Sequence, residues 1–75
     1  MNLKDLINKL KWHPDYSIND AIIWYISRGK ENDIDFIKGD EIVRIGNIFI
    51  ETKDAMIPYH RIKKIEYKGK TIFEK

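Results

Sequence analysis

Segment 57–62 of this 75-residue chain holds the side chains best suited to bind an anion. It reads Ile-Pro-Tyr-His-Arg-Ile, so a proline-restricted backbone adjoins Tyr59, His60 and Arg61. Arginine presents a planar fork that matches phosphate or carboxylate, histidine can donate a hydrogen bond or carry a proton, and tyrosine offers a flat stacking face. The segment therefore predicts an anion site. A structural alternative stays open, in which Tyr59 packs, His60 bonds a backbone carbonyl at the turn, and Arg61 is solvated.

A second candidate, Arg28-Gly29, follows Ser27 at the end of a run of β-branched and aromatic residues. Glycine directly after arginine at the end of a strand lets a ligand or another backbone approach closely. The same residues equally fit a plain strand end. For Arg28 and Arg61 to share a site, the fold must bring them close together.

Residues near the exit of the first expected helix form a third group. Trp12 and His13 precede Pro14, and these three side chains could line a small ligand site, although Trp12 would also complete a core. Tyr16 suits packing or the surface equally well. Lys64 belongs to a C-terminal lysine cluster that could attract phosphate without specificity.

Composition excludes several kinds of chemistry. The chain has no cysteine, which rules out disulfides, thiolate metal sites and cysteine nucleophiles. Its two histidines and scattered carboxylates make no zinc pattern, so neither a metal nor another cofactor is expected. The net charge of +2 is too mild to argue for nucleic acid, although residues 60–75 are the basic part. Without a long apolar run or a signal core, we expect a cytoplasmic protein with no membrane partner.

Apolar periodicity predicts one helix followed by short strands. Leucine or isoleucine at positions 3, 6, 7 and 10 forms a helical stripe, Asn2 is a suitable N-cap, and Pro14 should end the helix. Residues 30–35 are expected to be a loop, 38–40 a turn, and Trp24 a core residue. The helix is expected at about 2–12 and the strands at about 21–27, 41–45, 48–52, 55–58, 64–68 and 70–74.

This order of elements predicts an α+β fold. A single domain, 1–75, would hold an N-terminal amphipathic helix packed on a curled antiparallel meander of five or six short strands. Hydrogen bonds should run mostly between strands that are neighbours in sequence. Ile62 and Ile65 are three residues apart, which suits a short helical turn after Pro58.

Five short motifs, in their order and spacing, resemble a family of small, mostly archaeal, uncharacterised proteins. The resemblance covers essentially the whole chain. The motifs are Leu10-Lys11-Trp12-His13-Pro14, Arg28-Gly29, Gly39-Asp40-Glu41-Ile42, Ile57-Pro58-Tyr59-His60-Arg61-Ile62, and Gly69 with Ile72-Phe73-Glu74-Lys75. This domain has been proposed to be an RNA cyclic group end recognition domain, and it occurs fused or linked to RNA-repair enzymes.

The resemblance implies a non-catalytic RNA-binding module. Its partners would be RNA 3′ ends, above all ends with a 2′,3′-cyclic phosphate, and proteins of RNA repair or processing. A cyclic phosphate has one negative charge, so one or two arginines suffice to neutralise it. The implied phosphate-binding residues are Ser27, Arg28, Gly29, His60 and Arg61, the implied base-stacking residues are Tyr59 and Trp12, and His13, Tyr16 and Lys64 are further candidates.

One position departs from the family pattern. Members commonly carry histidine directly before the Arg-Gly pair, where this chain has Ser27. A serine hydroxyl can donate a hydrogen bond to a phosphate oxygen, but it is neither an acid nor a base near neutral pH. Catalysis at this position is therefore not expected.

Two other functions stay open. A phosphodiesterase could act on such RNA ends with His13 and His60 as general acid and base, although Asp15 is the only evident orienting carboxylate. A protein-interaction module could instead use a surface rich in tyrosine. The residues favour a binding module over an enzyme.

Overall fold

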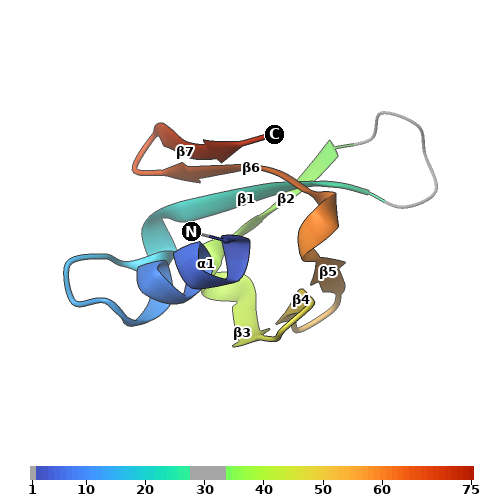
Figure 1. Cartoon of the computed structure of the whole chain (residues 1–75), viewed down its shortest axis with the longest axis horizontal. Helices are drawn as coiled ribbons and strands as arrows, with labels where there is room; N and C mark the ends of the chain where they lie inside the picture. The colour runs from blue at the N-terminus through green and yellow to red at the C-terminus, as the bar shows by residue number, and fades with distance from the viewer. Residues whose placement is uncertain (1, 28–33) are drawn as a thin grey trace.

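The chain forms one helix and two antiparallel sheets in this computed structural model (Figure 1). The structure describes residues 2–27 and 34–75. Helix α1 (Leu3–Trp12) comes first, and the strands are β1 (Ala21–Ile26), β2 (Ile34–Lys38), β3 (Ile42–Ile45), β4 (Phe49–Thr52), β5 (Met56–Pro58), β6 (Ile62–Tyr67) and β7 (Lys70–Glu74). Short 3₁₀ turns lie at η1 (Ile18–Asp20), η2 (Gly39–Glu41) and η3 (Tyr59–Arg61). The expected α+β class, with a leading helix, is confirmed.

Helix α1 begins and ends where local signals place its boundaries. The Asn2 side chain accepts a hydrogen bond from the Asp5 backbone N–H at 2.8 Å, which satisfies one of the free donors of the first turn. The helix ends before Pro14, and the His13 N–H closes it on the Lys9 carbonyl. The expected apolar stripe faces the core, where Ile7 and Leu10 are buried and Leu3 and Leu6 pack beside them.

Seven strands form two sheets, rather than one meander of five or six strands. The four-stranded sheet has the order β2-β1-β6-β7, and the three-stranded sheet has the order β3-β4-β5. Four of the five strand pairs join sequence neighbours, as expected, but β1 also pairs with β6, in register Ile23 to Ile65. This pairing joins the two halves of the chain.

The additional strand is β2, in a region expected to contain only a loop and a turn. Ile37 is the one buried residue of β2, because β2 lies at an edge of its sheet. Ile34 and Phe36 point away from the core and remain about half exposed. A strand with a single buried residue lacks the apolar pattern by which strands are predicted from sequence.

The core lies between α1, the inner face of the four-stranded sheet and the three-stranded sheet. Figure 1 shows α1 and β3–β5 gathered below the four-stranded sheet. Isoleucine fills most of this space, with short 3₁₀ turns leading from one sheet to the other. The buried residues are Ile7, Leu10, Ala21, Ile23, Ile37, Ile42, Ile50, Ile57, Ile62 and Ile65.

Trp24 does not lie in this core, contrary to expectation. Successive strand residues alternate between faces, so Trp24 lies on the face opposite Ile23 and is only half-buried. Its ring centre is 5.0 Å from that of Phe36, and its indole N–H donates to Glu66 Oε1 at 2.6 Å. The aromatic run of β1 therefore predicted a strand, but it did not predict on which face of the sheet each ring lies.

Candidate functional site

The η3 turn positions the residues of segment 57–62. It is a single 3₁₀ turn between β5 and β6, closed by the Ile62 N–H on the first carbonyl of the turn, which confirms the expected short helical turn. Pro58 precedes it with φ −63°, the value that the proline ring imposes. Three residues complete a 3₁₀ turn, so consecutive side chains point about 120° apart. As a result, His60 and Arg61 line different pockets.

Arg61 lines a pocket of about 330 Å³ at the junction of the two sheets. An apolar wall with a single guanidinium can hold a base or sugar while the guanidinium pairs with a phosphate. No acidic residue of ranges 2–27 and 34–75 lines this pocket. Its other lining residues are Tyr25, Ile26, Phe49, Ala55, Met56, Ile57 and Pro58, from the end of β1, from β4 and from β5 with the residue before it.

Tyr25 adds a neutral polar group to this wall. Burial, followed by the negative charges of Asp35 and Glu41, raises the pKa of the Tyr25 hydroxyl above its ordinary value. The hydroxyl therefore stays protonated at neutral pH. It adds no negative charge that would compete with an anion beside Arg61.

The sheet register brings Ser27 to the same end of the molecule. Tyr25 pairs with Ile62, the first residue of β6, so the chain leaves β1 beside the point where η3 enters β6. Ser27 follows β1 directly and is half-buried. Arg28 and Gly29 lie outside the described residues, so their phosphate contacts stay predictions from the sequence.

His60 lines a second pocket, of about 390 Å³, near the beginning of α1. Its side chain is exposed, and its backbone carbonyl accepts a hydrogen bond from Lys75 Nζ at 2.7 Å. Lys4 also lines this pocket and bonds the Asn47 side chain. The histidine therefore has lysine neighbours, and its imidazole does not share a pocket with Arg61.

Tyr59 anchors η3 to the hairpin of β3 and β4. Its hydroxyl donates to the Gly46 carbonyl at 2.6 Å, and its backbone N–H donates to the Ile48 carbonyl at 3.0 Å. The ring packs against the core, and burial raises the pKa of the hydroxyl. These contacts agree with the structural alternative for Tyr59, while a role in base stacking stays a prediction.

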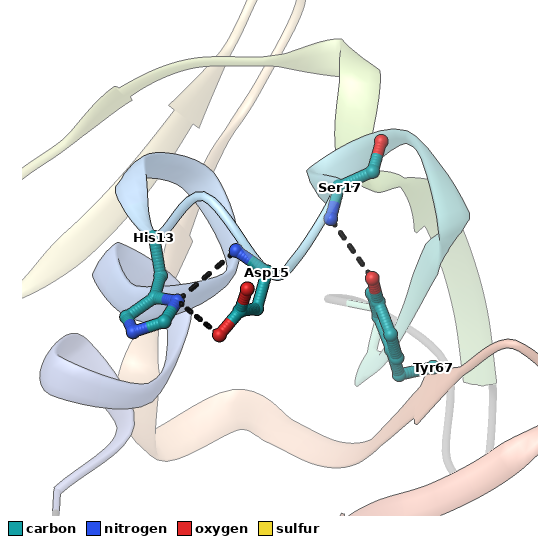
Figure 2. Close-up of polar contacts among 4 residues, drawn as sticks. All are labelled: His13, Asp15, Ser17 and Tyr67. Carbon is teal, nitrogen blue, oxygen red and sulfur yellow. Dashed lines mark hydrogen bonds and ion pairs between the residues drawn. The ribbon is translucent and has the colours of Figure 1, made fainter.

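The residues after α1 form a separate cluster, which Figure 2 shows. His13 Nδ1 accepts a hydrogen bond from the Asp15 backbone N–H at 3.2 Å, and the same atom is 3.8 Å from the Asp15 carboxylate. These two contacts exclude each other. Nδ1 accepts the backbone hydrogen bond only when it carries no proton, whereas its contact with the carboxylate is an ion pair only when the histidine is protonated. The Ser17 N–H donates to the Tyr67 hydroxyl at 2.8 Å. The Tyr16 ring contacts the rings of both His13 and Tyr67 edge-on.

This cluster and segment 57–62 lie at opposite ends of β6. The His13 ring is 5.4 Å from that of Tyr16, and the Tyr16 ring is 5.5 Å from that of Tyr67, the last residue of β6. His60 precedes the first residue of the same strand. At roughly 3.3 Å per residue, the ends of β6 are about 16 Å apart. The structure thus does not bring His13 and His60 around one phosphate.

Trp12 and Lys64 also lie apart from Arg61. Trp12 ends α1 next to His13 and is 73% exposed, so its ring is free to contact a ligand but lies at the other end of the molecule. Lys64 lies beside Trp24 on the four-stranded sheet, with Nζ 5.7 Å from the centre of the indole. Base stacking by Trp12 and phosphate contact by Lys64 therefore stay predictions from the sequence.

Neither a metal site nor a membrane-spanning helix is present in the described residues. Within residues 2–27 and 34–75, no group of three or more histidine, aspartate or glutamate side chains is placed to hold a metal ion. Over the same residues, no helix is long and apolar enough to cross a membrane.

Sequence reasoning missed the apolar wall of the Arg61 pocket. Phe49 and Met56 come from strands whose pairing alone places them beside Arg61. Their residue types gave no sign of this, because apolar residues in short strands usually serve the core. Tyr25 had one available signal, since it lies two residues before Ser27.

The fold and this pocket define a small α+β domain with Arg61 at an apolar junction between two sheets. Residues 1–75 match the family model described as MJ1316 RNA cyclic group end recognition domain, and the chain belongs to this family.

Relatives of similar length occur in several archaea. A UPF0248 protein of Methanococcus maripaludis, MMP0286, is 49% identical over 63 residues, which cover 84% of this chain and 82% of the relative. UPF0248 protein MJ1316 of Methanocaldococcus jannaschii is 37% identical over 75 residues, covering 97% of this chain and 92% of the relative. A UPF0248 protein of Archaeoglobus fulgidus is 34% identical over 70 residues, covering 92% and 99%. No solved structure is significantly similar to the chain.

Proposed function

We propose that this protein is a non-catalytic RNA-binding module that recognises RNA 3′ ends, above all 2′,3′-cyclic phosphate ends, in RNA repair or processing. The proposal rests on one observation: Arg61 lines an apolar pocket at the place where β1 ends. The family description, which names recognition of RNA cyclic group ends, supports the same function.

The pocket suits one terminal nucleotide. Its volume of about 330 Å³ is near the lower limit of ligand pockets, which favours a single small unit over a longer chain. The Arg61 guanidinium would pair with the two unbridged oxygens of a cyclic phosphate, while the ribose or base contacts Phe49 and Met56. Ser27, with Arg28 and Gly29 as predicted from the sequence, would supply further donors.

Binding without turnover agrees with the positions of the histidines. In-line cleavage of a cyclic phosphate needs an acid and a base on opposite sides of the phosphorus. His60 lines the pocket near the beginning of α1, and His13 belongs to the cluster at the far end of β6. Neither histidine therefore lines the Arg61 pocket.

The test is a binding titration with one short RNA in three forms. These forms end in 2′,3′-cyclic phosphate, 3′-phosphate or 3′-hydroxyl, and fluorescence anisotropy measures affinity at low and physiological salt while a gel checks the RNA. We expect a preference for the cyclic end of about tenfold or more over the hydroxyl end, equivalent to about 1.4 kcal/mol. The preference should survive salt, because non-specific attraction to the phosphate backbone does not.

Two substitutions at Arg61 and one matched control make the test specific. Arg61→Gln should abolish the preference, and Arg61→Lys should lose most of it because lysine cannot pair bidentately. Arg44→Gln removes the same charge from an exposed position on β3 and should leave the preference unchanged. Equal affinity for all three ends, or cleavage of the cyclic end, would refute the proposal.

A further inference from the structure

One face of the four-stranded sheet points away from α1 and the core. Its residues alternate along the strands with buried Ile23, Ile37 and Ile65. Ile26, Ile34 and Phe36 are 39%, 55% and 48% exposed, so no described element covers this face. We call it the outer face; it consists of Ile22, Trp24, Ile26, Ile34, Phe36, Lys38, Lys64, Glu66, Thr71 and Glu74.

One row of side chains crosses all four strands on the outer face. Trp24 pairs with Phe36 on one side and with Lys64 on the other, and Lys64 pairs in turn with Glu74. The two aromatic ring centres are 5.0 Å apart, and Lys64 Nζ is 5.7 Å from the indole centre. The hydrogen bond from the indole N–H to Glu66 fixes the orientation of the Trp24 ring.

The row borders a hollow that is predominantly basic. This hollow has a volume of about 330 Å³ and lies over Trp24 and Ile34. Its charged lining residues are three lysines, Lys63, Lys64 and Lys75, and one glutamate, Glu74. Glu66 also lies on the outer face, where its carboxylate is occupied by the indole N–H. An oriented aromatic ring bordered by excess positive charge is complementary to a base that carries its phosphate.

We infer that the outer face binds the nucleotides that precede the RNA 3′ end. A base stacks on Trp24 and Phe36, and the lysines of the hollow contact the phosphates on either side of it. This inference rests on the proposed function, because that function brings single-stranded RNA to the neighbouring pocket. It adds a second site, which does not distinguish one kind of RNA 3′ end from another but increases affinity for longer RNA.

The outer face is continuous with the Arg61 pocket. Ile26 belongs to the outer face and also lines that pocket. It is two residues beyond Trp24 on β1, about 7 Å along the strand. Ile26 thus joins the two surfaces, and an RNA with its terminal nucleotide at Arg61 can extend over Ile26 toward Trp24.

Single-tryptophan variants test this contact directly. The chain has two tryptophans, so Trp12→Phe leaves Trp24 as the only one, and Trp24→Phe leaves Trp12. The probes are uridine 2′,3′-cyclic phosphate and an oligouridine of five nucleotides with the same end. We expect the five-nucleotide RNA to quench Trp24 emission and the mononucleotide to leave it unchanged. Quenching of Trp12 by the five-nucleotide RNA without quenching of Trp24 would place the stacked base at the end of α1 and overturn the inference.

Affinity measurements separate stacking from charge. Trp24→Leu should weaken binding of the five-nucleotide RNA about tenfold, within the range for loss of one stacked base, and leave mononucleotide binding within twofold. Phe36→Ala, at a half-exposed edge position, serves as a second variant in case Trp24→Leu is poorly folded. Lys64→Gln should weaken RNA binding more than Lys70→Gln, which removes the same charge from an exposed residue opposite Tyr67, at the far end of β6.

The outcomes distinguish this inference from the proposed function. If the native protein prefers the cyclic end but Trp24→Leu and Phe36→Ala bind RNA normally, the outer face is not an RNA site. If RNA binding depends on Trp24 but shows no preference for the cyclic end, the outer face is an RNA site and the proposed end recognition is wrong. A native dimer that dissociates on Trp24→Leu, with RNA affinity unchanged, would assign the outer face to a protein contact and overturn the inference.

Discussion

At the scale of single residues, two neighbours in the sequence belong to different surfaces. His60 and Arg61 were predicted as one anion-binding pair because they are adjacent. The 3₁₀ geometry of η3 instead turns Arg61 to the junction of the sheets and His60 to the beginning of α1. Adjacent side chains point to opposite faces in an extended strand and about 120° apart in a 3₁₀ turn, so adjacency in the sequence does not by itself place two side chains in one pocket. The backbone conformation decides which pocket each side chain lines.

This separation predicts unequal effects of substitution at the two positions. His60→Ala should weaken binding of the cyclic end by less than about threefold, or about 0.7 kcal/mol, because its side chain lies outside the Arg61 pocket. Arg61→Gln should remove the preference altogether. Anisotropy titrations with the same three RNAs measure both variants. Equal losses for the two would show that His60 and Arg61 contact one ligand, contrary to the structure.

At the scale of elements, predictability follows the range of the interactions. Helix α1 was foreseen because its cap, its apolar stripe and its stop at Pro14 are all local. The edge strand β2 was not, because only Ile37 in it is buried. The pairing of β1 with β6 left no local signal either, and this pairing creates both the outer face and the Arg61 pocket. The sequence therefore identified candidate site residues, but it could not show which of them lie together in the fold.

Gly39 allows η1 and η2 to pack closely where the chain passes from the four-stranded to the three-stranded sheet. Gly39 begins η2, is buried, and lies against η1; a Cβ atom at this position would be 1.9 Å from the Ile18 carbonyl oxygen. Such a contact forces the backbones of η1 and η2 apart. Gly39→Ala should therefore lower the free energy of unfolding by about 2–3 kcal/mol, in the upper range for overpacking.

Urea denaturation of Gly39→Ala measures this effect, with Asp40→Ala as the matched control. Asp40 belongs to the same turn but is exposed, so its replacement should change the free energy of unfolding by less than about 0.5 kcal/mol. A Gly39→Ala protein as stable as the control would mean that η1 and η2 can separate freely. The glycine in the Gly39-Asp40-Glu41-Ile42 motif would then need another explanation.

At the scale of the whole molecule, the charges do little to hold the fold together. Across residues 2–27 and 34–75, the single close contact between opposite charges joins His13 to Asp15, and it needs a protonated histidine. The isoleucine core and the two sheets provide the stability, so most lysines remain available to solvent or to a polyanion. The sequence identified residues 60–75 as the basic part of the chain, with six lysines and arginines against Glu66 and Glu74.

Loss of stability at alkaline pH should come in part from two tyrosines. Burial raises the pKa of Tyr59, and burial with the charges of Asp35 and Glu41 raises that of Tyr25, above the ordinary value near 10. A raised pKa in the folded state means that folding favours the protonated hydroxyl. The contribution is thus complete below about pH 10, the unfolded pKa, and is lost as the pH rises through the higher folded values.

Replacing either tyrosine with phenylalanine should make this alkaline loss shallower. Tyr25→Phe, Tyr59→Phe and the double variant are compared with the native protein by urea denaturation from neutral pH to above pH 10, with near-ultraviolet absorbance reporting tyrosinate. Tyr59→Phe also removes the hydrogen bond to the Gly46 carbonyl, so its stability at neutral pH should fall while its slope above pH 10 decreases. The slope, and not the neutral baseline, is therefore the quantity that tests the linkage. If the double variant loses stability as steeply as the native protein, lysine deprotonation or another group governs alkaline unfolding, and the junction around Tyr25 is open to solvent.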